Sequence, residues 1–471
     1  MFRFARSRPV LGAVALAVAA GCTDRAAVTA PARAFSPTAS ASRDVTPIAG
    51  RHMFVMNSAV PANFAARVKA KGGTVVADFE QVRTVFTYGL SDADAAALAV
   101  GGFVANDVMV QWAPSPQDMH VSAASVGDVQ ADAPTTPLRA RLLSFQWNMF
   151  QIHAPETWAA GKLGSSSVKV GILDSGIDPD HQDLRGLVDR TNSTRAVYDT
   201  LKGCVYNNTP AAWADDFGHG TYVSGLVTTN NLIIAGVAPN VQLVGVKVLG
   251  SDGSGSFFDA VCGMIYAVDV AHVNVINLSL GHTFQGNTSG LVAFQQFLAF
   301  YVDYAKSQGA VVVSAAGNDD KNLGNPHPWL SLPCEAGDQI CVSATSNRDM
   351  IARYSNFGRA AIDVAAPGGE DKHLSKTGGQ PELLAEMVLS LCSGKAPHGL
   401  CPGSTSGYEF ADGTSASAPH VAGLAALIAS QHPTMSPDAI MALIRSSADI
   451  IGNQSKFGDG RINVARALGV Q

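Results

Sequence analysis

The chain has 471 residues, of which 47% are hydrophobic and 15% are charged, and its 38 acidic and 32 basic residues give a net charge of −6. This length has room for about three structural units of roughly 150 residues, and the composition excludes a disordered or coiled-coil chain. No dense block of Lys or Arg occurs, so we expect no nucleic-acid partner.

The first 22 residues have the pattern of a signal peptide. Three arginines precede an apolar run over residues 10–20, which is shorter than the roughly 20 residues of a membrane-spanning helix. The run ends in a segment, residues 19–22, that resembles a bacterial lipobox in which Cys22 would be lipidated. Plain cleavage and a lipid anchor on Cys22 both stay open, and both predict an extracellular or periplasmic location.

Residues 23–50 consist largely of Ala, Ser, Thr and Pro, which bury too little apolar surface to fold, so we expect a disordered tether. Residues 51–112 predict the order strand, helix, strand, strand, helix, strand, over residues 52–56, 61–71, 74–79, 82–88, 91–100 and 104–111. Ser91, with Asp94 three residues on, starts the second helix. This order predicts a small ferredoxin-like α+β domain. Residues 113–145, again rich in Ser, Ala, Asp and Pro, are expected to be a linker.

Residues 146–471 alternate apolar strand-like runs with helical stretches. Buried parallel strands are predicted at residues 168–173, 241–248, 273–278, 310–314 and 340–344. Helices are predicted at residues 220–228, 257–271, 291–307 and 417–431, and a last helix starts with Ser436 as N-cap and Pro437 in its first turn. Such alternation predicts an α/β domain with a doubly wound, mostly parallel sheet.

Apart from Cys22, the cysteines form an even set that suits disulfides in an oxidising compartment: Cys204, Cys262, Cys334, Cys341, Cys392 and Cys401. Six cysteines permit fifteen connectivities. Short separations favour Cys334 with Cys341 and Cys392 with Cys401, which leaves Cys204 with Cys262. A structural zinc site is the alternative, but no Cys-x-x-Cys pair occurs and the cysteines are not clustered with His.

Three short motifs contain an acid, a base and a hydroxyl among small residues. Asp174 follows the predicted strand 168–173, so its carboxylate lies at a strand end, where functional residues gather in parallel sheets. His219 lies between two glycines before a predicted helix, and Ser415 follows Gly-Thr before another. Taken singly, these residues have ordinary explanations as a turn residue, a structural histidine and a helix N-cap.

Taken together, the chain order Asp, His, Ser and the segments 171–178, 218–221 and 413–423 closely resemble the signatures of the subtilisin-like serine proteases, the subtilases. The resemblance extends through segments 315–318 and 364–368 and the last helix, and it covers about residues 146–468. It implies a subtilisin-like fold and a secreted serine endopeptidase that works through an acyl-enzyme. It also implies that residues 51–112 are an inhibitory propeptide and that the chain processes itself.

The resemblance further implies a role for each site residue. Ser415 is the nucleophile, His219 its general base, and Asp174 the group that holds the imidazole. Asn318 and the backbone N–H of Ser415 would stabilise the oxyanion. Two backbone segments would bind the substrate as an added strand: Gly253-Ser254-Gly255 and Ser279-Leu280-Gly281. Ala316 and Gly317 would help to form the wall of the pocket for the residue before the scissile bond. We expect that pocket to prefer apolar residues. An acidic Glu335 side chain at its base would contradict this preference.

Asp183 matches a calcium ligand of the family, but the loop over residues 228–236 is shorter than the usual calcium-binding loop, and calcium needs six to eight oxygens. Structural calcium and a capping role for Asp183 therefore both stay open, and no cofactor is expected for the chemistry. The long stretch 369–412, which contains Cys392 and Cys401, departs from the family pattern. It would be either a disulfide-pinned rim of the site or a surface insertion.

The partners that the resemblance implies are protein or peptide substrates and the chain's own propeptide, which would act as an intramolecular inhibitor and folding aid on a monomer. A catalytically inactive peptide-binding module is the alternative function, although all four catalytic positions contain competent residues. An esterase or lipase is disfavoured because no Gly-x-Ser-x-Gly motif surrounds Ser415.

Overall fold

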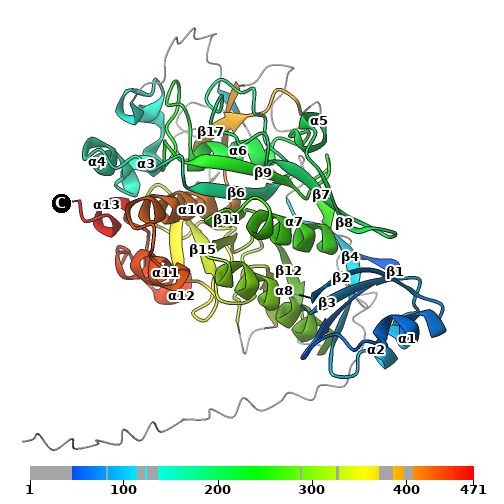
Figure 1. Cartoon of the computed structure of the whole chain (residues 1–471). Helices are drawn as coiled ribbons and strands as arrows, with labels where there is room; N and C mark the ends of the chain where they lie inside the picture. The colour runs from blue at the N-terminus through cyan, green and yellow to red at the C-terminus, as the bar shows by residue number, and fades with distance from the viewer. Residues whose placement is uncertain are drawn as a thin grey trace, which may run out of the picture. The chain divides into compact units, whose positions relative to one another are not determined.

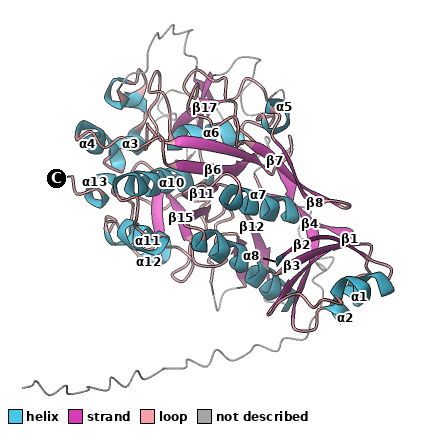
Figure 2. Cartoon of the chain, in the orientation of Figure 1, coloured by secondary structure: helices cyan, strands magenta, loops and turns pink. Residues whose placement is uncertain are grey.

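An eight-stranded sheet with helices on both faces forms the larger part of the structure (Figure 1, Figure 2). The computed structural model describes residues 45–80, 83–113, 122–124, 136–286, 289–324, 328–370, 386–396 and 407–470. The strand order is β16-β15-β13-β11-β6-β9-β7-β8, and every neighbouring pair is parallel except β7 with β8. The strands are β6 (Lys169–Asp174), β7 (Thr194–Asp199), β8 (Gly203–Asn207), β9 (Gln242–Lys247), β11 (Val275–Leu278), β13 (Val311–Ala315), β15 (Ile340–Thr345) and β16 (Val364–Pro367).

Both faces of this sheet are buried, as its continuous apolar runs predict. In β13, Val311 and Val313 belong to one hydrophobic cluster and Val312 to another. The first cluster contains residues of α6 (His219–Val227), α10 (Thr414–Gln431) and α11 (Pro437–Ser446), and the second contains residues of α7 (Phe257–Asp269) and α8 (Ser289–Ser307). The predicted doubly wound α/β fold is therefore confirmed.

Residues 45–113 form the ferredoxin-like unit, with an antiparallel sheet in the order β4-β1-β3-β2. Alternate residues of one strand face opposite sides: Phe54 packs with the unit's two helices, whereas Met53 and Val55 join the core of the larger domain. The elements are β1 (Val45–Met56), α1 (Phe64–Ala70), β2 (Thr74–Phe79), β3 (Thr84–Tyr88), α2 (Asp92–Leu98) and β4 (Gly102–Gln111). Ser91 caps α2 as predicted, because its hydroxyl accepts a hydrogen bond from Asp94 N.

The ferredoxin-like unit contacts the larger domain through polar and aromatic groups. Asp107 accepts hydrogen bonds from Ser256 Oγ (2.9 Å) and Phe258 N (3.1 Å), so its carboxyl group lies at the N-terminus of α7, where these donors offset part of the cost of its burial. Phe86 packs against Tyr198 and Phe258, with ring centroids 4.9 and 5.2 Å apart. This interface is part of one continuous hydrophobic cluster.

Two predicted boundaries are wrong. Residues 45–50 belong to β1 and not to a tether, because β4 offers them a hydrogen-bonding partner, with Val45 opposite Val110. The linker predicted over 113–145 also contains structure. Residues 137–145 form two 3-10 turns that bury Leu143, and Leu142 N donates to Ile233 O at 2.7 Å.

Two strands of the insertion predicted over residues 369–412 form a small antiparallel sheet with a strand at residues 122–124. Its order is β17 (Val388–Cys392), β18 (Gly407–Ala411) and β5 (Ser122–Ala124). All five residues of β17 are buried, so the described part of the insertion is a packed element of the domain. The remaining strands and short helices are β10 (Ser254–Ser256), β12 (His282–Gln285), β14 (Trp329–Leu332), α3 (Trp147–Gln151), α4 (Ala154–Ala159), α5 (Pro210–Trp213), α12 (Gln454–Phe457) and α13 (Val464–Ala467).

Two disulfides join the predicted partners: Cys204 with Cys262, which ties β8 to α7, and Cys334 with Cys341. Cys392 is also disulfide-bonded, and its predicted partner Cys401 lies outside the described residues, as does Cys22. Within the described part of the chain, no helix has the length and apolar character that crossing a membrane requires.

Candidate active site

The carboxyl ends of two adjacent central strands, β6 and β11, define the site. Asp174 is the last residue of β6, and Ser279 follows the end of β11, which pairs in parallel with β6. The Asp174 side chain is fully buried. Its backbone carbonyl accepts hydrogen bonds from Val248 N (2.9 Å) and Leu249 N (3.2 Å), which fix the strand end.

His219 is the first residue of α6 and is bonded to Asp174. Its Nδ1 lies 2.9 Å from both carboxylate oxygens of Asp174. Gly220 permits this approach, since a Cβ there would lie 2.1 Å from Gly176 O. When Nδ1–H donates a hydrogen bond to the carboxylate, the neutral ring has an unprotonated Nε2 that can act as a base. Nε2 is buried and has no hydrogen-bond partner in the described part of the chain.

The surroundings of His219 act on its pKa in two directions. Burial of the ring lowers the pKa, whereas the charge of Asp174, its hydrogen bond and the more distant charge of Asp215 raise it. The raising effects prevail, so the pKa of His219 lies above its ordinary value of about 6.5. The pair can therefore hold the proton that a nucleophile loses.

Asp215 connects the segment that follows Asp174 with the start of α6, which contains His219. Its Oδ1 accepts from Ser175 Oγ (2.8 Å) and Gly218 N (2.7 Å), and its Oδ2 accepts from Thr221 N (2.8 Å). Ser175 Oγ in turn accepts from Gly220 N at 2.9 Å. Sequence reasoning missed Asp215, because an acid four residues before a histidine is an ordinary loop residue.

Ser415 lies in the first turn of α10, which begins at Thr414 and not at the predicted residue 417. Its backbone carbonyl accepts a hydrogen bond from Ser279 Oγ at 2.9 Å. Because β11 is the neighbour of β6, this bond places Ser415 at the carboxyl ends of these two strands, where Asp174 also lies. No hydrogen bond joins Ser415 to His219 among the described residues, and such contacts are often long before substrate binds.

Asn318 follows β13 and is bonded to the residue before Ser415. Its Oδ1 accepts hydrogen bonds from Thr414 N (2.9 Å) and Thr414 Oγ1 (2.7 Å). Thr414 Oγ1 also accepts from Gly317 N at 3.1 Å. Since the oxygen of the amide is occupied, its nitrogen remains the donor for another group. Sequence reasoning missed this role of Thr414.

The two predicted substrate-binding segments enclose the extended backbone of residues 111–113. Trp112 N and Ala113 N donate to Gly253 O at 3.3 and 3.2 Å, and Gly281 N donates to Trp112 O at 3.2 Å. Gln111 pairs with Ser254 in an antiparallel ladder, and the Trp112 indole donates to Gly255 O at 3.0 Å. The segments therefore hold a chain by its backbone, as an added strand is held.

Other predicted pocket residues pack into the interior of the domain. Leu280 and Ala316 are buried, and Ala316 O accepts from Ser331 Oγ at 2.8 Å. Glu335 accepts a hydrogen bond from Ser331 N at 2.7 Å, and burial raises the pKa of Glu335 to about 7. One oxygen of this carboxyl group is therefore held by the backbone.

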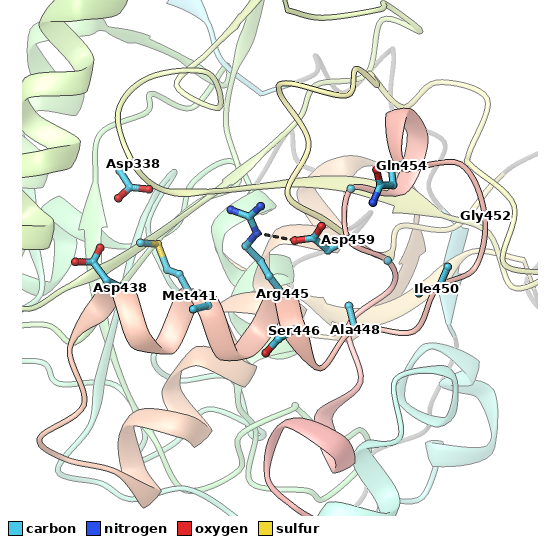
Figure 3. A pocket seen from close by; sticks show the side chains of 13 residues that line it. Asp338, Asp438, Met441, Arg445, Ser446, Ala448, Ile450, Gly452, Gln454 and Asp459 are labelled. Atoms are coloured by element: carbon cyan, nitrogen blue, oxygen red, sulfur yellow. Dashed lines mark hydrogen bonds and ion pairs between the residues drawn. The ribbon is translucent and has the colours of Figure 1, made fainter.

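A cavity of about 690 Å³ lies elsewhere, between α11 and the chain over residues 450–460 (Figure 3). In Figure 3 the side chains of Arg445 and Asp459 point toward each other, and their Nε and Oδ2 atoms are 2.7 Å apart. None of Asp174, His219, Asn318 and Ser415 lines this cavity. It is therefore separate from the candidate active site.

The chain is similar to known proteins over most of its larger domain. A family model described as the subtilase family matches residues 165–467. Subtilisin E of Bacillus subtilis (strain 168) is 33% identical over 328 residues, which cover 69% of this chain and 71% of that protein. Thermitase of Thermoactinomyces vulgaris is 34% identical over 337 residues, which cover 71% of this chain and 99% of thermitase.

A similar solved structure is that of the epidermin leader peptide processing serine protease (EpiP) of Staphylococcus aureus. It has a TM-score of 0.66 and 22% identity, and the match covers 89% of this chain and 98% of that one. At this identity the likeness is one of fold. A protease of Pseudoalteromonas arctica has a TM-score of 0.56 and 28% identity, covering 71% of this chain and 99% of that one.

Proposed function

The chain belongs to the subtilase family of serine endopeptidases, and from that premise we propose that Asp174, His219 and Ser415 are its catalytic triad and that it is secreted as a self-processing zymogen. The observation that supports this most is the extended segment 111–113, which backbone hydrogen bonds hold between Gly253 and Gly281 of the two predicted substrate-binding segments. The chain's own segment would thus occupy the groove as a substrate does.

In the proposed reaction, Ser415 Oγ attacks the carbonyl carbon of the scissile bond while His219 Nε2 takes the hydroxyl proton. The carbonyl oxygen becomes an anion. When this intermediate collapses, the C–N bond breaks, and His219 gives its proton to the departing amine. A water molecule then repeats the sequence on the acyl-enzyme: His219 takes its proton, the water oxygen bonds to the acyl carbon, and Ser415 Oγ leaves with the proton returned.

Covalent labelling tests this assignment against the inactive peptide-binding module, which the family relationship does not favour. An organophosphonate reacts with an activated serine, so we expect the processed chain to be labelled at Ser415. Peptide mapping by mass spectrometry locates the label, and Ser415→Ala is the control. Processed protein that stays unlabelled would support the binding module.

Asn318→Ala is expected to lower kcat by about 10²–10³-fold, with little change in KM, because the Asn318 amide nitrogen would donate to the oxyanion only as negative charge develops. Steady-state hydrolysis of a peptide p-nitroanilide gives both constants. Thr414→Val is the matched variant: it removes the hydroxyl that orients the amide and leaves the donor itself, so a smaller loss is expected. An unchanged kcat for Asn318→Ala would remove Asn318 from the mechanism.

The ferredoxin-like unit would inhibit the enzyme until it dissociates, and its docking is expected to weaken as pH rises. Burial raises the pKa of Asp107 to about 6 and that of Asp259 to about 7, with Arg51, whose Nη1 is 3.2 Å from Asp107, as the cation beside them. The Asp107 carboxyl, which is bonded to Ser256 and Phe258 of the larger domain, binds its proton more tightly in the docked state than when the unit is separated. Protonation therefore favours docking, and Asp107 alone would change the affinity about tenfold between pH 5 and 8.

Size-exclusion chromatography of the cut wild-type chain at pH 5 and pH 8 measures this effect, with more of the unit released at pH 8. Asp107→Asn imitates the protonated carboxyl and should reduce the pH dependence. Release that is equal at both pH values, or greater at pH 5, contradicts the prediction.

Secretion, the lipid anchor and the substrate preference remain parts of this proposal. Intact mass and N-terminal sequencing of the exported product distinguish plain cleavage from a lipidated Cys22. For the residue before the scissile bond, we propose apolar side chains, because the Glu335 carboxyl is bound by Ser331 N. Faster cleavage after Lys than after Phe or Leu in matched p-nitroanilides would reject that preference.

A further inference from the structure

Asp183, the residue that resembles a calcium ligand, has its carboxylate surrounded by hydrogen-bond donors. The side chain is fully buried. Its Oδ1 accepts from Leu232 N at 2.7 Å, and its Oδ2 accepts from Ile233 N at 3.1 Å and Ile234 N at 3.4 Å. Oδ2 also accepts from Tyr408 Oη at 2.9 Å. Four donors therefore point at the position where a cation would bind.

The carbonyl groups of the same turn, which could bind a cation, are used elsewhere. Leu232 O accepts from Arg141 N at 3.3 Å, and Ile233 O accepts from Leu142 N at 2.7 Å. Ile234 O accepts from Thr229 Oγ1 at 2.8 Å. Calcium is held by six to eight oxygens, and here the turn presents N–H groups to Asp183 while its carbonyls face away. No group of three or more His, Cys, Asp or Glu in the described part of the chain suits a metal.

Tyr408 belongs to β18, on the insertion that departs from the family pattern, and the segment around Asp183 contacts it at several points. Tyr408 Oη accepts a hydrogen bond from Gln182 Nε2 at 2.9 Å while it donates to Asp183. His181 Nε2 is 2.8 Å from Gly407 O, and the His181 and Tyr408 rings pack edge to face at 5.3 Å. Tyr408 is only 3% exposed.

We propose that Tyr408 and the N–H groups of residues 232–234 take the place of a calcium ion at Asp183, so that this part of the fold is stable without the metal. The donors supply the positive partial charges that a buried carboxylate requires. The insertion thus has a structural role. Since β18 ends at Ala411, shortly before Ser415, the same contact also anchors the chain that leads to the nucleophile.

Thermal unfolding of the full-length Ser415→Ala chain, in excess EGTA and in excess CaCl₂, tests this proposal without self-digestion. Tyr408→Phe keeps the ring and removes the hydroxyl, which leaves the buried carboxylate one donor short. We expect its unfolding midpoint to fall by about 1–3 °C, equally in both solutions. Tyr304→Phe is the matched control, because Tyr304 donates to the Asp269 carboxylate in a partly exposed position, and its effect should be smaller.

Asp183→Asn, measured in the same two solutions, addresses the metal directly. We expect any response of the midpoint to calcium to be the same with and without the Asp183 charge. The proposal is overturned if calcium raises the midpoint of the parent chain and Asp183→Asn abolishes that rise. A midpoint that Tyr408→Phe leaves unchanged overturns it equally, since the hydroxyl would then not stabilise the carboxylate.

Discussion

Ser415→Ala is expected to lower peptide hydrolysis by about 10⁶-fold and to leave the chain uncut, with residues 45–113 still attached. The hydroxyl is the group that would form the acyl-enzyme, and no other described side chain of the site can replace it at the start of α10. Hydrolysis of a peptide p-nitroanilide measures the first effect, and intact mass of the purified protein measures the second.

Ser417→Ala is the matched control for this prediction. Ser417 is on the same helix, and its hydroxyl donates to Ala366 O at 3.0 Å, away from the groove. That variant should be processed and active. Normal maturation of purified Ser415→Ala would show that another protease cuts the chain, whereas residual activity near the wild-type level would exclude Ser415 as the nucleophile.

Asp174→Asn is expected to lower kcat by about 10⁴-fold. An amide has nearly the shape of the carboxylate, but it can donate a proton to Nδ1 and so favour the tautomer in which Nε2 carries the hydrogen and cannot act as a base. The charge that stabilises the imidazolium is lost as well. Fluorophosphonate labelling should slow in parallel, because the same base activates Ser415.

The pH profile provides a second readout of Asp174→Asn. The active form needs a neutral His219, and the Asp174 charge raises the pKa of His219 above its ordinary value. The rising limb of kcat/KM should therefore lie above pH ~6.5 in the wild type and move to lower pH in the variant. Asp180→Asn is the control, because Asp180 is an exposed acid in the loop after β6. This variant should not change the pH of the rising limb. A limb that moves to higher pH in Asp174→Asn would contradict the assignment.

The hydrogen bonds of Asp215 help to fix the position of His219 relative to Asp174. Its carboxylate accepts from Ser175, which follows Asp174, and from Gly218 and Thr221, which flank His219. The hydrogen bond from Gly220 N to Ser175 Oγ joins the same two segments at 2.9 Å. This shared acceptor gives the pair a defined geometry before any substrate arrives.

The sequence by itself predicted the central parallel strands β6, β9, β11, β13 and β15 and the residues that we propose for the site. Runs such as 311–313 predict buried strands from their composition, and Asp174, His219, Asn318 and Ser415 are recognisable because each lies in a short motif whose neighbours are small. Such signals are local. Each signal depends only on residues that are close together in the sequence. Examples are the apolar run of a strand, the glycine beside His219 and the N-cap at Ser436.

Only the tertiary structure decided which polar groups, distant in the sequence, form hydrogen bonds with one another. Tyr408 and Asp183 are hydrogen-bonded although they are 225 positions apart in the chain. Asp107 accepts a hydrogen bond from Phe258 N at the start of α7, 151 positions away. Residues 45–50 form a strand because β4 is beside them, whereas their composition alone predicts a tether. A buried carboxylate can be satisfied by any suitable donor, and that donor is chosen by the packing of whole elements, which no local pattern specifies.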